Sequence, residues 1–426
     1  MAATIGESER PNLLLLQTDQ HRWDALGRVT PGLKTPNLDA LAARGSHFTR
    51  AVCQVPMCMP SRYSMLLGLY PSQAGTRHNT QMIADHERAP APFIAERLAA
   101  AGYATAAFGG THFYEGEPFF EAGFPVRASR HGFETIVTNR RDGPGPADRV
   151  MSEEEPEITA VLAAERRGFG GGGEDPAGYA GRVSAVPGRL HPEAWLADRA
   201  MEWLNERKND PRPWFGYVTL HAPHPGFNVP DGYEELYDLD AISDSPEPPW
   251  TAEPPGHARP AERWRGWWQG LDSRERRRCI LRYRAVCSFS DAQLGRVLAH
   301  VTALGLEGNT LVVFVSDHGE MLGARGGRFS KYCLYDGAVR VPLILAGSGI
   351  GKRGEDRRAA ELVDVVPTLL AAAGLNAPDL PGVDLRSDFV RAGTFAEMHG
   401  RGYERARHGP SYMLRTDRWK LILSWP

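Results

Sequence analysis

The sequence NLLLLQT, residues 12–18, is an apolar run of β-strand length that leads directly into Asp19, Gln20 and His21. A run without polar alternation is typical of a parallel strand that is buried on both faces. In an open sheet of such strands, ligands bind beyond the carboxyl ends. The sequence therefore predicts a buried strand at 12–18 with functional side chains directly after it.

Similar strand-like runs recur along the chain, at 103–108, 214–220, 310–316 and 339–345. Segments with helical spacing lie between or beside them, at 35–45, 194–206, 285–304 and 362–373. This alternation predicts an α/β fold in which helices cover both faces of a large, mixed, mainly parallel sheet.

The domain prediction is one catalytic α/β domain over residues 1–375 and a small C-terminal antiparallel-sheet subdomain over 376–426, abbreviated at its end. Irregular insertions are expected at about 140–189, which is acidic and then glycine-rich, and at about 227–270. The second is rich in Pro and Trp and is expected to form an extended cover. Its tryptophans around 263–268 either stack on a sugar ring or pack internally, and packing is favoured.

The chain has 426 residues, of which 42% are hydrophobic and 24% charged, as in a folded globular protein. Its formal net charge of −3 provides no broad positive field for nucleic acid or an anionic membrane. The N-terminal sequence lacks a signal-peptide pattern, and no run approaches the roughly 18 apolar residues of a membrane span. We therefore expect a cytoplasmic protein with no nucleic-acid or membrane partner.

The five cysteines are odd in number and scattered, which fits neither a disulfide framework nor zinc-ribbon spacing. Cys53, Cys279, Cys287 and Cys333 are expected to be small core residues. Cys58 differs because it opens the sequence CMPSR before a helix predicted over 60–67, with Arg62 one turn along. A thiol at a helix N-terminus beside a cation is a candidate nucleophile, although a buried structural cysteine is an equal alternative at this point.

Two predicted strands end in groups that bind metals: Asp19 and Gln20 follow one, and Asp317 and His318 follow another. Three oxygen ligands and one imidazole suit Ca, Mg or Mn better than structural zinc. Each Asp taken alone is more often a helix cap. Taken together, these side chains predict one divalent-cation site where two strand ends meet.

The motif CMPSR resembles the Cys-x-Pro-Ser-Arg signature by which type I sulfatases mark a cysteine for oxidation to Cα-formylglycine. The sequences RPNLLLLQTDQHRWDALG and TPNLDALAARG before it are similar to that family in order and spacing. So are SDHGEMLGARGGRFSKYCLYDGAVRVPLILAG, ELVDVVPTLLAAAG and YMLRTDRWKLI after it. The resemblance runs from about residue 10 to the end, weaker across 125–190 and 228–270. It implies an alkaline-phosphatase-like fold and a sulfuric ester hydrolase.

The resemblance also implies a role for each matched residue. Asp19, Gln20, Asp317 and His318 match the ligands of one divalent cation, with Ca preferred and Mg or Mn as alternatives. Cys58 matches the precursor of the formylglycine nucleophile, Arg62 and Lys331 match groups that bind the aldehyde hydrate and the anion, and His112 matches the histidine that orients the formylglycine. His224 matches the histidine that contacts the transferred group and protonates the leaving oxygen.

Three positions depart from the common family pattern. Gln20 replaces a second aspartate, as in the choline-sulfatase-like and phosphonate-monoester-hydrolase-like branch, and Asn79 matches a substrate-contacting Asn of the phosphonate hydrolases. Gly110 stands where the family has a lysine, and Ala74 where it has a histidine. The missing lysine removes a cation from the anion pocket. Because only five of the 49 basic residues are lysines, an arginine is the expected replacement.

The sequence therefore predicts hydrolysis of a small-molecule or saccharide sulfate ester, after maturation by a formylglycine-generating enzyme. A metal and cations would hold the charge of the sulfate, and an acid would protonate the leaving alkoxide. Two alternatives stay open: a phosphonate monoester or phosphodiester hydrolase with the same nucleophile and metal, and a non-catalytic anion-binding relative. The oligomeric state is not predicted.

Overall fold

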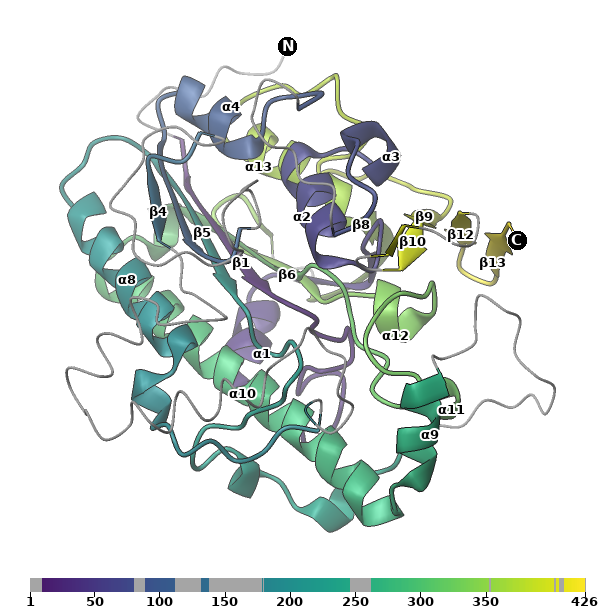
Figure 1. Ribbon diagram of the computed structural model, residues 1–426. Coiled ribbons are helices and arrows are strands. Elements are labelled where there is room, and N and C mark those ends of the chain that lie inside the picture. Colours follow the sequence, from purple (N-terminus) through teal and green to yellow (C-terminus); the bar gives the residue numbers. More distant parts are fainter. Residues whose placement is uncertain are drawn as a thin grey trace.

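The computed structural model describes residues 10–79, 89–111, 132–137, 178, 180–245, 262–351, 354–401, 404–405 and 410–425. Its centre is an eight-stranded mixed sheet of order β4-β3-β5-β1-β6-β7-β2-β8 (Figure 1). The strands are β1 (Asn12–Thr18), β2 (Ser46–Val52), β3 (Ala104–Gly109), β4 (Thr135–Val137), β5 (Trp214–Leu220), β6 (Thr310–Ser316), β7 (Leu343–Gly347) and β8 (Gly354–Glu361). Strand β7 is antiparallel to both of its neighbours, whereas the other described pairings in this sheet are parallel.

Helices cover both faces of this sheet. They are α1 (Pro36–Ala43), α2 (Cys58–Leu67), α3 (Pro71–Ala74), α4 (Ile94–Ala100), α8 (Pro192–Arg207), α9 (Glu262–Gly270), α10 (Ser273–Ala303), α11 (Ala324–Gly327), α12 (Asp336–Val339) and α13 (Val365–Ala372). Short 3-10 helices are η3 (Gly188–Leu190), η4 (Glu234–Leu236), η5 (Leu239–Ala241), η7 (Glu307–Asn309) and η8 (Leu362–Asp364).

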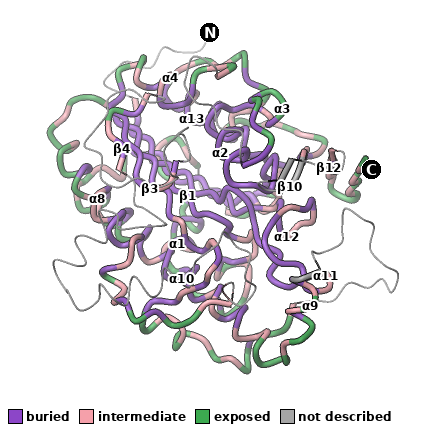
Figure 2. The backbone as a smooth tube through the Cα atoms, viewed as in Figure 1, coloured by how far each residue is buried: buried purple, intermediate pink, exposed green. Residues whose placement is uncertain are grey.

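Strand β1 carries apolar side chains on both faces of the sheet, and a layer of helices covers each face. Side chains alternate across a strand, so Leu13 and Leu15 join the apolar cluster with α2, α4 and α13. Leu14 and Leu16 join the cluster with α1, α8 and α10 on the other face. All seven residues of β1 are buried, and Figure 2 shows the same burial along the central strands.

A separate three-stranded antiparallel sheet lies near the C-terminus, in the order β13-β12-β9. It consists of β9 (Thr394–Met398), β12 (Ser411–Arg415) and β13 (Lys420–Ser424), and the pair β10 (Gly400–Arg401) and β11 (Glu404–Arg405) lies between them in sequence. The predicted fold class, a large mixed sheet between helices plus a small antiparallel C-terminal sheet, is confirmed. The domain boundary at residue 375 stays a prediction.

The sequence prediction of elements was accurate in the sheet centre and weaker at its edge. Strands β1, β5 and β6 have the predicted bounds, but β7 starts at Leu343 because residues 336–339 form helix α12 instead. Strand β2 was missed, and so was β8, a charged sequence (GEDRRAAE) at the sheet edge. Helix α10 starts twelve residues before the predicted 285, where Asp272 forms a capping box with Glu275.

The first predicted insertion lies largely outside the described residues. The second is not wholly extended, since residues 262–270 form helix α9. Trp264 and Trp268 of that helix are buried and pack against Phe329, with ring centroids 5.9 and 4.9 Å away. The packing alternative for these tryptophans is therefore confirmed.

The four cysteines predicted as core residues are buried, and all five cysteines are free thiols. Burial raises the pKa of Cys53, Cys279 and Cys287. Among the described residues, no helix has the length and apolar character needed to cross a membrane.

Candidate active site

The predicted metal ligands meet because β1 and β6 are neighbouring parallel strands. Thr18 pairs with Ser316, so Asp19 and Asp317 leave the same edge of the sheet. The backbone N–H of Gln20 donates to Asp317 Oδ1 at 3.0 Å, and that of Asp19 donates to the carbonyl of Leu220 at 3.1 Å. The two strand ends and the end of β5 are thus held together by hydrogen bonds.

Helix α2 places Cys58 against this edge. The helix begins at Cys58, two residues before the predicted start, and ends at Gly68, whose φ of 72° is in the left-handed region that favours glycine. The Ser61 hydroxyl donates to the Asp317 carbonyl at 2.5 Å. The backbone N–H of Met59 donates to Asn79 Oδ1 at 3.2 Å, which brings the predicted substrate contact Asn79 beside the first turn.

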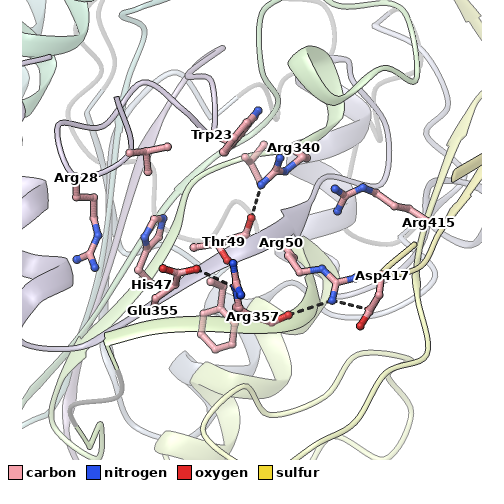
Figure 3. A pocket seen from close by; sticks show the side chains of 13 residues that line it. Trp23, Arg28, His47, Thr49, Arg50, Arg340, Glu355, Arg357, Arg415 and Asp417 are labelled. Atoms are coloured by element: carbon pink, nitrogen blue, oxygen red, sulfur yellow. Dashed lines mark hydrogen bonds and ion pairs between the residues drawn. The ribbon is translucent and has the colours of Figure 1, made fainter. Parts of the chain in front are cut away.

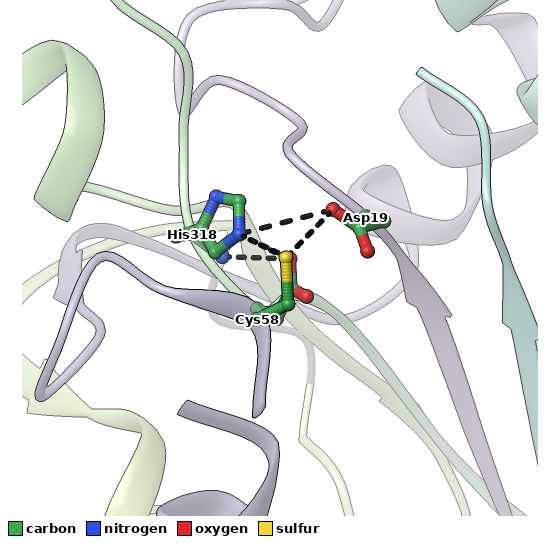
Figure 4. A group of neighbouring side chains, drawn as sticks. Asp19, Cys58 and His318 are labelled. Carbon is green, nitrogen blue, oxygen red and sulfur yellow. Dashed lines mark hydrogen bonds and ion pairs between the residues drawn. The ribbon is translucent and has the colours of Figure 1, made fainter. Parts of the chain in front are cut away.

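Cys58 lies among candidate ligands, as Figure 4 shows. Its sulfur is 3.3 Å from His318 Nε2 and 3.8 Å from Asp19 Oδ1. Ligand atoms of Asp19, Cys58, Asp317 and His318 all lie within 4.8 Å of one another, and all four residues are buried. This donor set, two carboxylates with an imidazole, could hold one divalent cation beside residue 58.

Arg62 compensates the two buried carboxylates. Its guanidinium donates to Asp317 Oδ2 at 3.0 Å and to Asp19 Oδ2 at 2.9 Å, and the arginine is only 2% exposed. It also donates to the Thr219 hydroxyl at 2.9 Å and to the Gly110 carbonyl. Arg62 therefore fixes both carboxylates from one side and leaves their other oxygens facing Cys58 and His318.

Lys331 reaches the same centre from a loop after β6. Its Nζ donates to Cys58 Sγ at 2.9 Å and to Gln20 Oε1 at 2.7 Å. The flanking residues Ser330 and Tyr332 have φ values of 64° and 58°, a conformation that costs energy for non-glycine residues. The surrounding structure must hold this backbone in place.

Glu320 holds that loop, although no sequence pattern predicted this role. Its carboxylate accepts hydrogen bonds from the N–H groups of Leu322 at 2.8 Å and Ser330 at 2.5 Å, and from the side-chain amide of Gln20. Burial raises its pKa. The sequence marks Glu320 only by its position two residues after His318. That position does not distinguish a metal ligand from a residue that positions the ligands.

Burial and charge set the protonation states at the site. Burial and the Asp19 carboxylate raise the pKa of Cys58 to about 12, although Lys331 opposes the shift. Burial and Asp317 would raise the pKa of Asp19, but Lys331 and Arg62 lower it below its ordinary value. Burial and Lys331 lower the pKa of His318, so its imidazole is neutral and can donate a lone pair to a metal.

His224 and His112 are the two other histidines that the sequence predicts for the site. His224 follows the end of β5, the strand beside β1, and its ring lies against the ring of His221, with centroids 4.5 Å apart and planes tilted by 32°. Its Nδ1 lies 2.8 Å from the Pro225 carbonyl, which can only accept, so Nδ1 carries the proton. His112 lies outside the described residues.

Two of the three departures from the common family pattern, Gly110 and Ala74, lie among the described residues outside the metal-ligand set. Gly110, in place of a lysine, has its carbonyl bound by Arg62. Ala74, in place of a histidine, is buried at the end of α3. Arg62 matches the family's own signature arginine, so the arginine expected to replace the missing lysine is not identified among the described residues.

Comparison with known proteins gives consistent matches. The family model for Sulfatase matches residues 11–375. An ulvan-active sulfatase of Formosa agariphila is 30% identical over 385 residues, which cover 89% of this chain and 65% of that protein. The chain thus spans about two thirds of the length of that relative.

Solved structures share the fold. The phosphonate monoester hydrolase of Agrobacterium radiobacter superposes with a TM-score of 0.76 at 24% identity, covering 97% of this chain and 87% of its own. A protein solved in complex with its substrate, D-glucosamine-2-N,6-O-disulfate, gives a TM-score of 0.69 at 19% identity and covers 97% and 88%.

Proposed function

Because the chain belongs to the sulfatase family, we propose that it hydrolyses sulfate esters with a formylglycine made from Cys58. The observation that carries this proposal is the surroundings of the Cys58 sulfur, which has Lys331 Nζ at 2.9 Å and His318 Nε2 at 3.3 Å. A buried thiol with a pKa near 12 is a poor nucleophile at neutral pH. Conversion of Cys58 to an aldehyde hydrate would supply an oxygen nucleophile at this position instead.

We propose that Asp19, Gln20, Asp317 and His318 hold one divalent cation, with Ca preferred over Mg or Mn. The donor set fits because buried carboxylate oxygens and a neutral imidazole converge within 4.8 Å. When bound, such a cation polarises the sulfate and stabilises negative charge on its oxygens. Lys331, as a fixed cation in a buried site, would hold a further sulfate oxygen.

His224 is the proposed proton donor to the leaving alcohol. Its Nδ1 proton is committed to the Pro225 carbonyl at 2.8 Å, so the acid proton must be on Nε2 of the imidazolium. His112 is the proposed residue that orients the formylglycine. Arg62 positions Asp19 and Asp317 and stays charged, since the pKa of its guanidinium is raised by these carboxylates despite burial.

The proposed substrate is a sulfated saccharide, and the proposed maturation partner is a formylglycine-generating enzyme. Support for the saccharide comes from the relative named for activity on ulvan and from the fold neighbour whose substrate is a disulfated glucosamine.

Co-expression with a formylglycine-generating enzyme tests the proposal. Peptide mass spectrometry should show the thiol of Cys58 replaced by an aldehyde oxygen, and aryl sulfate hydrolysis should rise in proportion to the modified fraction. The Cys58→Ala variant should have no activity, and Cys333→Ala, another buried cysteine, serves as the matched control. Full activity of Cys58→Ala would contradict the proposal.

A second candidate function is hydrolysis of phosphonate monoesters or phosphodiesters at the same site. It is favoured by Gln20, which leaves the metal site one negative charge short of the two-aspartate pattern, and by Asn79 beside the first turn of α2. The ratio of kcat/KM for an aryl sulfate and an aryl phosphodiester decides between the two. Absence of both activities in fully modified, metal-loaded protein would favour a non-catalytic anion-binding protein.

A further inference from the structure

A polar cavity of about 690 Å³ is lined by none of the residues assigned to the active site. It is bounded by β2, β8, the end of β12 and the segment that follows β1 (Figure 3). Five arginines line it: Arg28, Arg50, Arg340, Arg357 and Arg415. Two carboxylates, Glu355 and Asp417, also line it, so positive charges exceed negative ones by three. We call this cavity the arginine pocket.

Ion pairs inside the arginine pocket neutralise only some of its arginines. Arg50 pairs with Asp417 at 2.6 Å, and Arg357 pairs with Glu355 at 3.1 Å. No ion pair of Arg28 is found among the described residues.

The two remaining arginines share one carboxylate with a third cation. Asp336 lies 3.7 Å from Arg340, 3.3 Å from Arg415 and 2.7 Å from Lys420. One acid therefore serves three bases, which leaves a net positive charge at this end of the arginine pocket.

Arg340 and His47, which line the arginine pocket, both have lowered pKa values. Burial lowers the pKa of Arg340 to about 10, and Arg415 and Arg50 act in the same direction, whereas Asp336 and Asp24 oppose them. Burial, Arg28 and Arg340 lower the pKa of His47 to about 4. Burial is the largest cause of both shifts, and the neighbouring arginines add to it.

The donors are held in place before any ligand arrives. The guanidinium carbon of Arg340 lies 3.4 Å from the centroid of the Trp23 ring, and its Nη2 donates to the Thr49 carbonyl at 2.5 Å. Arg50 Nη1 donates to the Arg357 carbonyl at 3.2 Å. Fixed guanidinium groups lose little entropy when they bind sulfate, phosphate or carboxylate oxygens.

We propose that the arginine pocket binds a small polyanion that carries two or more sulfate, phosphate or carboxylate groups. The cavity falls in the size range of pockets for small organic ligands, which is larger than one inorganic anion needs. Guanidinium groups around it match several oxyanions at once. The chain as a whole is slightly acidic, so this attraction is local.

The arginine pocket is close to the active site but separate from it. Trp23 follows Gln20 by three residues, so their Cα atoms are at most about 11 Å apart. None of the lining residues is a proposed ligand, nucleophile or acid. The proposal therefore goes beyond the proposed function.

Calorimetric titration of the full chain tests the proposal, with sucrose octasulfate and tripolyphosphate as probes at constant ionic strength. The double variant Arg28→Gln/Arg357→Gln removes two exposed charges without breaking a buried ion pair. We expect its Kd for the tighter probe to rise at least about tenfold, because two charged hydrogen-bond donors are lost. The matched control Arg182→Gln/Arg274→Gln removes two exposed arginines elsewhere and should leave Kd unchanged.

Two further measurements separate the arginine pocket from the active site. The Lys331→Met variant should bind the probe as the unchanged protein does, and the arginine double variant should hydrolyse a small monosulfate ester normally. Preference for the sulfated or the phosphorylated probe identifies the source of the anions. Binding weakened by Lys331→Met but not by the arginine double variant would overturn the proposal, as would an equal effect of the control or binding of neither probe. These binding measurements remain informative even if no sulfatase activity is found.

Discussion

Lys331 Nζ lies 2.9 Å from the sulfur of Cys58, although 273 residues separate the two in the sequence. The same ammonium group lies 2.7 Å from Gln20 Oε1. One cation thus contacts both the proposed nucleophile position and a proposed metal ligand. An anion bound at residue 58 would meet Lys331 directly.

Replacing Lys331 with methionine should reduce kcat/KM for an aryl sulfate by about 10²–10³, since one fixed cation that stabilises the transition-state charge is lost. Methionine keeps most of the side-chain volume, so the melting temperature should change little. The exposed Lys34→Met is the matched control. A loss of less than about threefold would show that Lys331 does not contact the transferred group.

Metal content should depend on Asp19. In Asp19→Asn, one anionic candidate ligand is lost, and we expect the affinity for Ca to fall at least about tenfold. Elemental analysis after dialysis against a series of free Ca concentrations measures this change. The exposed Asp231→Asn should bind metal like the unchanged protein. Equal metal content in all three proteins would place the cation elsewhere.

Glu320 is expected to act as a positioning residue. Glu320→Gln keeps the shape of the side chain but replaces one of the two carboxylate oxygens with an amide nitrogen, which cannot accept a hydrogen bond. One oxygen of Glu320 accepts from Leu322 and Ser330 and the other accepts from Gln20, so the variant loses at least one of these contacts. Loss of this support should reduce metal affinity about 10- to 100-fold and lower kcat as Lys331 becomes less fixed. Glu202→Gln on the exposed face of α8 is the control. A purely structural role would lower the melting temperature without changing metal affinity per folded molecule.

Acid should destabilise the protein in part through His191, which directly precedes α8 and packs edge-on against Phe289. Burial lowers its pKa from 6.5 to about 4, so the folded protein binds fewer protons than the unfolded chain between these values. Burying neutral His191 therefore costs no stability above about pH 6.5. The folded state loses stability as the pH falls toward 4, because the unfolded chain binds the proton and the folded protein does not. The loss by pH 4.5 should be on the order of 2 kcal/mol.

Urea unfolding at pH 7.5 and 4.5 measures this effect of His191. The free energy of unfolding of His191→Gln should fall less between the two pH values than that of the unchanged protein. His300→Gln, at a half-buried position on α10, should keep the full pH dependence. Identical pH dependence in all three would exclude His191 as the source.

Local sequence patterns were sufficient for the centre of the fold and for much of the site. Strands β1, β5 and β6 could be predicted because a strand buried on both faces must be apolar at nearly every position. Since such strands are parallel, their carboxyl ends share one edge, and this placed Asp19 near Asp317. The motif around Cys58 identified a residue at a helix N-terminus.

Other features depended on contacts between residues far apart in the sequence. Strand β8 escaped prediction because an edge strand exposes part of its surface and need not be apolar. Glu320 carries no local mark of its role, which comes from the fold of the loop that returns Ser330 and Gln20 to its carboxylate.

The sequence by itself determined the central buried strands β1, β5 and β6, where they end and which reactive side chains follow them, because burial and capping act between near neighbours. Only the tertiary structure decided that Lys331 faces Cys58 and that arginines from β2, β8 and β12 surround one cavity. These arrangements depend on strand order and register, which bring together residues hundreds of positions apart. The spacing of residues along the chain does not predict these contacts, because they depend on how the helices and the sheet pack together.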